Sequence, residues 1–182
     1  MCIRDSLTAL ASALVARRQK AIAVIQRFAA AAEGGVATRV HGDLHLGQIL
    51  VTGSEVKFID FEGEPAKPLE IRRAKASPLR DVAGMVRSFD YAAATAAIAA
   101  STVAEGVEAR GAEMVAQFRE VATRRFLAAY DEVAGGYSPE LLDLFLIEKA
   151  AYEITYEAAN RPAWIGTPMR GLAEILDRLL GA

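Results

Sequence analysis

A short stretch of β-type sequence, QILVTGSEVKFIDF (residues 48–61), stands out in a chain whose other apolar residues recur mostly at helical spacing. Two apolar runs flank TGSE (residues 52–55), and this spacing predicts two strands joined by a turn. The preceding segment VATRVHGD (residues 36–43) is also of β type. We therefore expect a mainly α fold with one small β-hairpin element, and that element carries the polar cluster of the chain.

Helix signals account for most of the remaining sequence. Apolar periodicity predicts one helix over residues 7–33, with Ser6 as its N-cap and Gly34-Gly35 as its end, and another over residues 107–133. Three further helices are expected to open at a hydroxyl residue followed by proline, at Ser77-Pro78, Ser138-Pro139 and Thr167-Pro168. Residues 62–77 are typical of a loop. No repeat or long linker divides the chain, so one domain over residues 7–182 is predicted.

Composition and charge exclude several classes of partner. The chain carries 21 lysine and arginine residues against 23 acidic ones, a net charge of −2. This balance argues against nucleic acid as a partner, because its binders usually present a basic face. The longest apolar runs are interrupted by charges, which argues against a membrane span. The single cysteine, Cys2, fits a reducing cytoplasm, and the opening MCIRDS predicts a non-native start to a fragment.

Both histidines of the chain lie in VHGDLHLGQILV, on either side of Asp43. Residues two apart on a strand face the same way, so His41, Asp43 and His45 could converge on a metal ion. Metal-dependent phosphoesterases with this spacing need further histidines, and the sequence has none. A hydrogen-bonded structural cluster at the end of a strand is a second interpretation.

The downstream segment FIDFEGEP favours a third interpretation, phosphoryl transfer. Gln48 stands five residues after Asp43, and Asp60 stands seventeen residues after it, across the predicted hairpin. Phosphoryl transfer needs one carboxylate to orient the attacking hydroxyl and oxygen ligands to hold magnesium. Asp43, Gln48 and Asp60 follow the order in which kinase-like enzymes place these groups, and a glutamine carbonyl is a suitable magnesium ligand.

HGDLHLGQIL together with FIDFEGEP resembles the phosphotransferase family of aminoglycoside and choline kinases. Gln48, where most members have asparagine, and the continuation EGEPAKPLEIRRAKASPLRDVAGMVRSFDYAAA resemble its maltokinase branch, also found fused to trehalose synthase. The later segment EKAAYEITYEAANRPAWIGTPMRGL extends the resemblance over nearly everything after residue 38. It implies the C-terminal lobe of a protein-kinase-like fold, which transfers the ATP γ-phosphate to maltose and gives maltose 1-phosphate for α-glucan synthesis.

The resemblance also implies a role for each matching residue. Asp43 is expected to be the catalytic base or hydroxyl-orienting group, and Gln48 and Asp60 are expected to be Mg²⁺ ligands. His45 falls where relatives keep a residue near the transferring phosphate. Glu62 is expected either to help position the metal or sugar or to be a surface carboxylate.

Two further residues are expected to support the catalytic loop. His41 is predicted to brace it. Asp81, in PLRDVAG, lies at the start of a helix, where kinase-like folds anchor this loop.

The acceptor sugar is expected to bind through aromatic faces and fixed polar groups. Tyr152 and Tyr156 are four residues apart and share a helix face, with Lys149 at its edge and Trp164 just past the helix end. Such pairs also occur in helix cores. Two carboxylates on the same helix are expected to flank the site or to face water, namely Glu153 and Glu157.

The nucleotide-binding half of such a kinase is missing from the sequence. The residues before position 34 contain one lysine, Lys20, within a helical pattern, and no glycine-rich nucleotide loop is present. The chain is therefore expected to be an isolated C-terminal lobe that is inactive alone. A kinase for another small hydroxylated acceptor, and a non-catalytic kinase-like module that binds sugar or a partner enzyme, are the alternatives.

Overall fold

The computed structural model describes residues 3–32, 35–101 and 108–181. The chain divides into two compact units: a terminal unit of residues 1–35 and 138–182, and a central unit of residues 36–137. Both units are mostly helical, and the strands within the described ranges form one two-stranded sheet. The mainly α architecture with a small β-hairpin is therefore confirmed.

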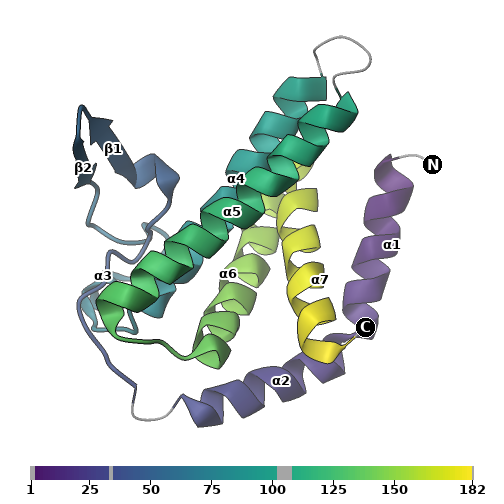
Figure 1. The fold of residues 1–182 in the computed structure, drawn as a ribbon. Helices are drawn as coiled ribbons and strands as arrows, with labels where there is room; N and C mark the ends of the chain where they lie inside the picture. The colour runs from purple at the N-terminus through teal and green to yellow at the C-terminus, as the bar shows by residue number, and fades with distance from the viewer. Residues whose placement is uncertain (1–2, 33–34, 102–107, 182) are drawn as a thin grey trace. The chain divides into compact units, whose positions relative to one another are not determined.

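The terminal unit consists of helices α1 (Ile3–Ala16), α2 (Arg18–Ala31), α6 (Pro139–Asn160) and α7 (Gly166–Leu180), with the 3-10 turn η2 (Pro162–Trp164) before α7. Helix α6 packs along α7, α2 packs against α6, and α1 packs against α7 (Figure 1). Arg178 of α7 donates two hydrogen bonds, of 2.9 and 2.7 Å, to the carboxylate of Asp143 on α6. The core of the unit contains buried apolar residues from three of these helices: Val24, Phe28, Leu146, Ile147, Ala150 and Leu176.

The single helix predicted over residues 7–33 is wrong, because the structure breaks it at Arg17. No proline or glycine marks the break, which follows tertiary packing: α1 packs against α7, whereas α2 packs against α6. The Arg17 side chain pairs with Asp177 of α7, a partner 160 residues away. Ser6 is not an N-cap either, since α1 begins at Ile3.

Other helix boundaries follow the local signals. The Ser138 hydroxyl accepts a hydrogen bond of 3.1 Å from the backbone N–H of Leu141, so it caps α6 as predicted. Before it, Gly135 and Gly136 adopt φ values of 72° and 108° and end the preceding helix, because only glycine takes such values without strain. The last helix, in contrast, begins at Gly166 rather than at Thr167-Pro168, which lie in its first turn, and no side chain caps it.

The central unit comprises the 3-10 turn η1 (Leu46–Gln48), strands β1 (Ile49–Thr52) and β2 (Glu55–Phe58), the short helix α3 (Leu69–Arg73), and the long helices α4 (Leu79–Ser101) and α5 (Glu108–Ala134). Helices α4 and α5 lie side by side (Figure 1). Helix α4 also approaches the loop that carries the polar cluster. A Cβ atom at Gly84 would lie 2.5 Å from the carbonyl oxygen of Leu44, so glycine allows this close contact.

Two β and loop predictions for this unit need correction. Residues 36–43 form no strand; Thr38 makes an isolated bridge to Ala76, with N–H···O distances of 2.9 Å in both directions. Further along, the backbone N–H groups of His41 and Gly42 donate to a side chain instead of a neighbouring strand. The predicted loop over residues 62–77 contains α3.

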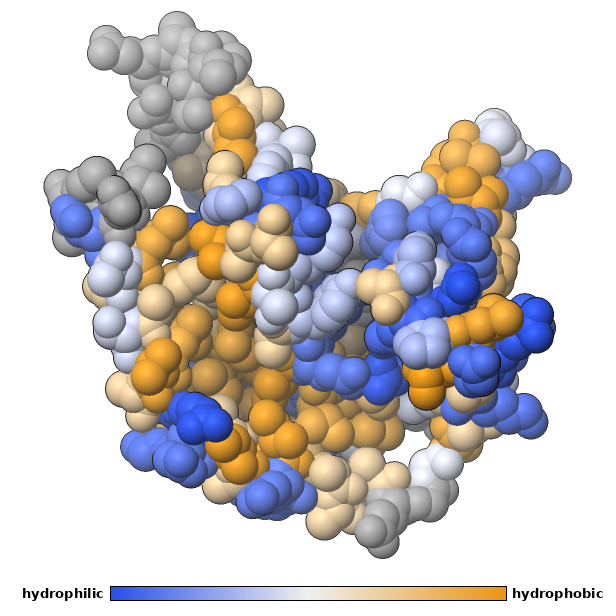
Figure 2. All heavy atoms as spheres, turned by 180° about the vertical axis from the view of Figure 1, so that it is seen from behind, coloured by the Kyte–Doolittle hydropathy of each residue, from blue (hydrophilic) through white to orange (hydrophobic). Residues whose placement is uncertain are grey.

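The hairpin itself is confirmed. β1 and β2 pair antiparallel, with Ile49 opposite Phe58 and Val51 opposite Val56, so these apolar side chains share one face. Val51 is 72% exposed and Phe58 is 49% exposed. Figure 2 shows apolar side chains, in orange, at the surface among hydrophilic ones in blue.

None of the helices in the described ranges combines the length and apolar character needed to cross a membrane.

Candidate functional site

The loop that follows Val40 is anchored by Asp81, in the first turn of α4. Its carboxylate accepts hydrogen bonds from the backbone N–H groups of His41, at 2.6 Å, and Gly42, at 2.9 Å. Hydrogen bonds to an ionised acceptor are among the stronger ones in proteins. Gly42 has a φ of +84°, and a Cβ atom there would lie 3.3 Å from the Cα of Gly63. Asp81 therefore holds the backbone directly before Asp43.

The His41 side chain lies inside this loop and is 6% exposed. Its Nε2–H donates to the carbonyl oxygen of Ile59 at 2.8 Å, while Nδ1 accepts from the backbone N–H of Asp43 at 3.4 Å. Both contacts are satisfied by one neutral tautomer, with the proton on Nε2. The ring also contacts Phe61, with 4.8 Å between centroids. His41 thus links the loop before Asp43 to the segment after β2.

This geometry does not favour the metal interpretation of His41, Asp43 and His45. Both ring nitrogens of His41 are engaged in the protein. In the part of the chain that the structure describes, no group of three or more His, Cys, Asp or Glu side chains could hold a metal ion.

Gln48 and Asp60 meet across the hairpin. The Gln48 Nε2 donates to Asp60 Oδ2 at 3.1 Å, and the backbone N–H of Ile59 donates to the backbone carbonyl oxygen of Gln48 at 3.0 Å. Asp60 has a φ of +64°, an uncommon value for a residue other than glycine. An amide and a carboxylate provide the oxygen ligands that Mg²⁺ prefers, so this donor set fits that ion. Binding through Gln48 Oε1 would require the amide to turn, because its nitrogen now faces Asp60.

His45 caps the 3-10 turn η1 that carries Gln48. Its Nδ1 accepts from the backbone N–H of Gly47 at 3.0 Å, and its Nε2 lies 3.4 Å from Gln48 Nε2. A Cβ atom on Gly47 would lie 2.8 Å from the His45 ring, so a larger residue there would displace the ring from this cap. His45 therefore orients the turn from which Gln48 projects.

The Glu62 side chain is largely exposed, at 63%. Its carboxylate lies 3.8 Å from Nη1 of Arg72, and its backbone carbonyl accepts from the same nitrogen at 3.1 Å. Arg72 belongs to the run IRRAK (residues 71–75), whose charges by themselves predict a solvated loop, and it was not among the predicted site residues. Tyr130 of α5 was also missed: burial, with Asp81 as the smaller cause, raises the pKa of its hydroxyl.

The predicted acceptor residues lie in the terminal unit, on α6 and η2. The rings of Tyr152 and Tyr156 stack, with 6.3 Å between centroids and 29° between planes. Lys149 Nζ lies 5.5 Å from the Tyr152 ring centroid, and Arg161 Cζ lies 5.6 Å from that of Tyr156. Tyr156 is 43% exposed. Two aromatic rings thus stack on one helix face, with a cation over each.

Trp164 ends η2 and is half-buried, and its backbone N–H donates to the Arg161 carbonyl at 2.8 Å. Arg161, the C-cap residue of α6, was not among the predicted acceptor residues.

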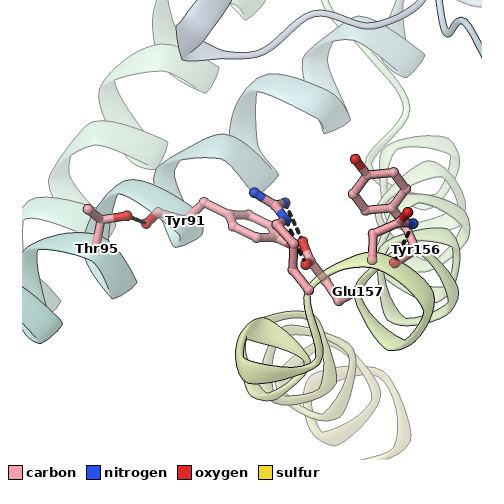
Figure 3. Close-up of polar contacts among 6 residues, drawn as sticks. Tyr91, Thr95, Tyr156 and Glu157 are labelled. Carbon is pink, nitrogen blue, oxygen red and sulfur yellow. Dashed lines mark hydrogen bonds and ion pairs between the residues drawn. The ribbon is translucent and has the colours of Figure 1, made fainter.

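Glu153 and Glu157 do not face water: they are 8% and 1% exposed. Glu157 accepts two hydrogen bonds from Arg161, at 3.0 and 2.5 Å; Figure 3 shows this pair as dashed lines beside Tyr156. A buried carboxylate of this kind needs such a partner, because desolvation of a charge is costly. The same figure shows the separate hydrogen bond of 2.8 Å from Thr95 to the Tyr91 carbonyl in α4.

The predicted site residues therefore form two groups. Seven lie in the central unit, and contacts link most of them: His41, Asp43, His45, Gln48, Asp60, Glu62 and Asp81. Four lie in the terminal unit: Lys149, Tyr152, Tyr156 and Trp164.

No protein-family model matches the chain. Over 143 residues it is 33% identical to a glucosamine kinase of Mycolicibacterium smegmatis, covering 75% of this chain and 34% of that protein. Over 147 residues it is 29% identical to a glucosamine kinase of Streptacidiphilus jiangxiensis, covering 78% and 32%. The chain thus spans about a third of the length of the curated relatives it matches.

Solved structures of glucosamine kinase are also similar to the chain. One in complex with glucosamine, ADP and inorganic phosphate has a TM-score of 0.62 at 26% identity, over 80% of this chain and 36% of that one. Another, crystal form B, has a TM-score of 0.70 at 26% identity, over 92% and 40%. These relatives are sugar kinases, which supports the sugar-phosphotransferase part of the sequence prediction. They do not support maltose as the specific acceptor.

Proposed function

We propose that this chain is the C-terminal part of an ATP-dependent sugar kinase, and that its acceptor is glucosamine. The observation that carries the proposal is the arrangement around Asp43. Asp81 anchors the loop backbone at His41 and Gly42, directly before Asp43. Further along the chain, Gln48 and Asp60 contact each other at 3.1 Å. The similarity to glucosamine kinases supports the class of reaction and suggests the acceptor. Residues 7–182 would form one lobe, and the ATP-covering lobe would lie outside this chain.

In the proposed mechanism Asp43 accepts a hydrogen bond from the sugar hydroxyl, orients it and takes its proton during transfer. Gln48 and Asp60 would hold Mg²⁺, which would supply positive charge to neutralise the phosphate groups. His45 keeps the turn of Gln48 in place through its cap at Gly47. His41 and Asp81 fix the loop backbone before Asp43, so little reorganisation accompanies the reaction.

The acceptor is proposed to contact Lys149, Tyr152, Tyr156 and Trp164. A pyranose ring presents an apolar C–H face that packs on tyrosine or tryptophan, and its hydroxyls need polar groups at the edge. Glu62 is proposed as a residue at the margin of the metal site, since its carboxylate is largely exposed.

Maltose remains a second candidate acceptor because of one observation on α6. Lys149 and Arg161 each lie over a ring of the tyrosine pair. The positive charge of Lys149 disfavours an ammonium group at the Tyr152 face and favours a neutral sugar, whereas the charge of Arg161 is paired with Glu157. A fusion or complex with trehalose synthase is proposed only for the case in which maltose is the acceptor.

Product analysis with the full-length protein tests these proposals. Protein, ATP and Mg²⁺ are incubated with glucosamine or maltose in turn, and ADP release and the sugar phosphate are measured. We expect sugar-dependent ADP release with glucosamine and a much smaller rate with maltose. The reverse preference would select the maltose candidate. No sugar-dependent release, from a protein shown to bind ATP, would refute the kinase assignment.

A further inference from the structure

Arg72 on α3 reaches back over the turn that follows Asp60. Its Nη1 donates to the backbone carbonyl of Glu62 at 3.1 Å and lies 3.8 Å from the Glu62 carboxylate. The methylene stem passes over Gly63: a Cβ atom on that glycine would lie 3.4–3.6 Å from the Cβ, Cγ and Cδ of Arg72. The side chain is 21% exposed, so most of this long cation is covered.

The turn under Arg72 lies against the loop of Asp43. Gly63 has a φ of +76°, and its Cα lies 3.3 Å from the position that a Cβ atom on Gly42 would occupy. Gly42 is the residue before Asp43, and Asp81 holds its N–H. Movement of the Glu62–Gly63 turn would therefore change how the segment of Asp60 meets the segment of Asp43.

Helix α3 is itself fixed to the same loop. Three residues after it, Ala76 exchanges two hydrogen bonds of 2.9 Å with Thr38, which lies three residues before His41. A five-residue helix is too short to be stable alone, so this bridge helps to hold α3, and with it the backbone of Arg72, in place. Contacts therefore connect α3 to the loop of Asp43 at two places. Arg72 packs over Gly63, which lies against Gly42, and Ala76 is hydrogen-bonded to Thr38.

The burial of its guanidinium separates Arg72 from an ordinary surface arginine. Its neighbour Arg73 is exposed, as expected for a charged run that faces water. By contrast, Nε of Arg72 is buried and has no hydrogen-bond partner in the part of the chain that the structure describes. A buried donor without a partner is unfavourable. The contacts with Glu62 and Gly63 therefore hold the side chain at this position, even though its Nε makes no hydrogen bond.

We propose that Arg72 is a positioning residue that holds the turn after Asp60 against the loop of Asp43, and so sets the distance between the two carboxylates. The role rests on the proposed kinase function, in which these carboxylates serve one reaction. Arg72 does not act on the substrate; it acts through the backbone of Glu62 and Gly63.

Three variants of the full-length protein test this role. R72M keeps an apolar stem over Gly63 but loses the donor to Glu62, R72K keeps the charge, and R73M is the matched control on the same helix. We expect the Mg²⁺ concentration for half-maximal rate to rise about 10-fold or more in R72M, as for other residues that orient metal ligands. R72K should show a smaller rise, and R73M should match the wild type. The KM for the sugar should change much less than the Mg²⁺ requirement.

Amide hydrogen exchange gives a second measurement that does not depend on activity. In R72M, peptides that cover residues 59–66 should exchange faster, with a smaller increase at residues 41–45 and none in α5. R73M should leave all of these unchanged. Faster exchange in a protein that phosphorylates no sugar would retain the positioning role and refute the proposed function. Unchanged exchange and an unchanged Mg²⁺ requirement in folded R72M would overturn the role of Arg72.

Discussion

The central and terminal units hold their candidate residues in different ways. In the central unit the backbone is the main partner: Asp81 holds two N–H groups, His41 holds one carbonyl and one N–H, and Arg72 holds one carbonyl. In the terminal unit the candidate acceptor residues are arranged by side chains that stack on α6. Backbone contacts fix atoms within narrow limits, whereas a stack of long side chains adapts to its ligand. We therefore expect the first group to determine the rate and the second to determine the choice of sugar.

The largest effect is expected from Asp43. In the full-length protein, Asp43→Ala should lower kcat about 10²- to 10⁴-fold, because it removes the group that is proposed to orient the hydroxyl and accept its proton. Steady-state kinetics should show a KM for the sugar that changes much less. A near-normal kcat in this variant would show that Asp43 has no catalytic role, and it would contradict the expectation that the central unit determines the rate.

The anchor of the central loop should be next in size. Asp81→Ala leaves the N–H groups of His41 and Gly42 without their charged acceptor, which should lower the free energy of unfolding by about 2–3 kcal/mol. Urea denaturation measures this, and Glu132→Ala, an exposed carboxylate in the same unit, is the control that should change little. Equal stability of the two variants would show that Asp81 does not anchor the loop.

Variants of Gln48 test whether its side chain is one of the Mg²⁺ ligands. Gln48→Ala should raise the Mg²⁺ concentration for half-maximal rate about 10-fold, because it removes one of the two proposed oxygen ligands. Gln48→Glu keeps an oxygen in place and should retain more of the affinity. If both variants titrate with Mg²⁺ as the wild type does, the ion binds elsewhere.

The smallest effect is expected on α6. Tyr156→Ala should raise the KM for the sugar about 2- to 10-fold, the range that the loss of an aromatic contact produces, and leave kcat nearly unchanged. Tyr156→Phe keeps the ring and should behave like the wild type. A large fall in kcat with a constant KM would contradict the division of roles between the two units.

Signals read along the chain predicted local structure wherever the cause of that structure is local. Ser138-Pro139 opens a helix because a hydroxyl caps its first turn, and Gly135-Gly136 ends the preceding one because both residues take positive φ values. The TGSE turn set the pairing of β1 with β2. The order and spacing of Asp43, Gln48 and Asp60 along the chain also indicated the candidate site.

Tertiary structure decided the features whose partners lie far apart in sequence. The break at Arg17 follows packing of α1 against α7 and of α2 mainly against α6, and a periodic sequence does not mark it. Arg72 belongs to a charged run that a sequence alone assigns to solvent, and folding places its guanidinium over the turn after Asp60. Asp81 reaches the loop 39 and 40 residues before it. Caps and turns depend on the conformation of a few neighbouring residues, whereas these contacts exist only once distant segments have been brought together.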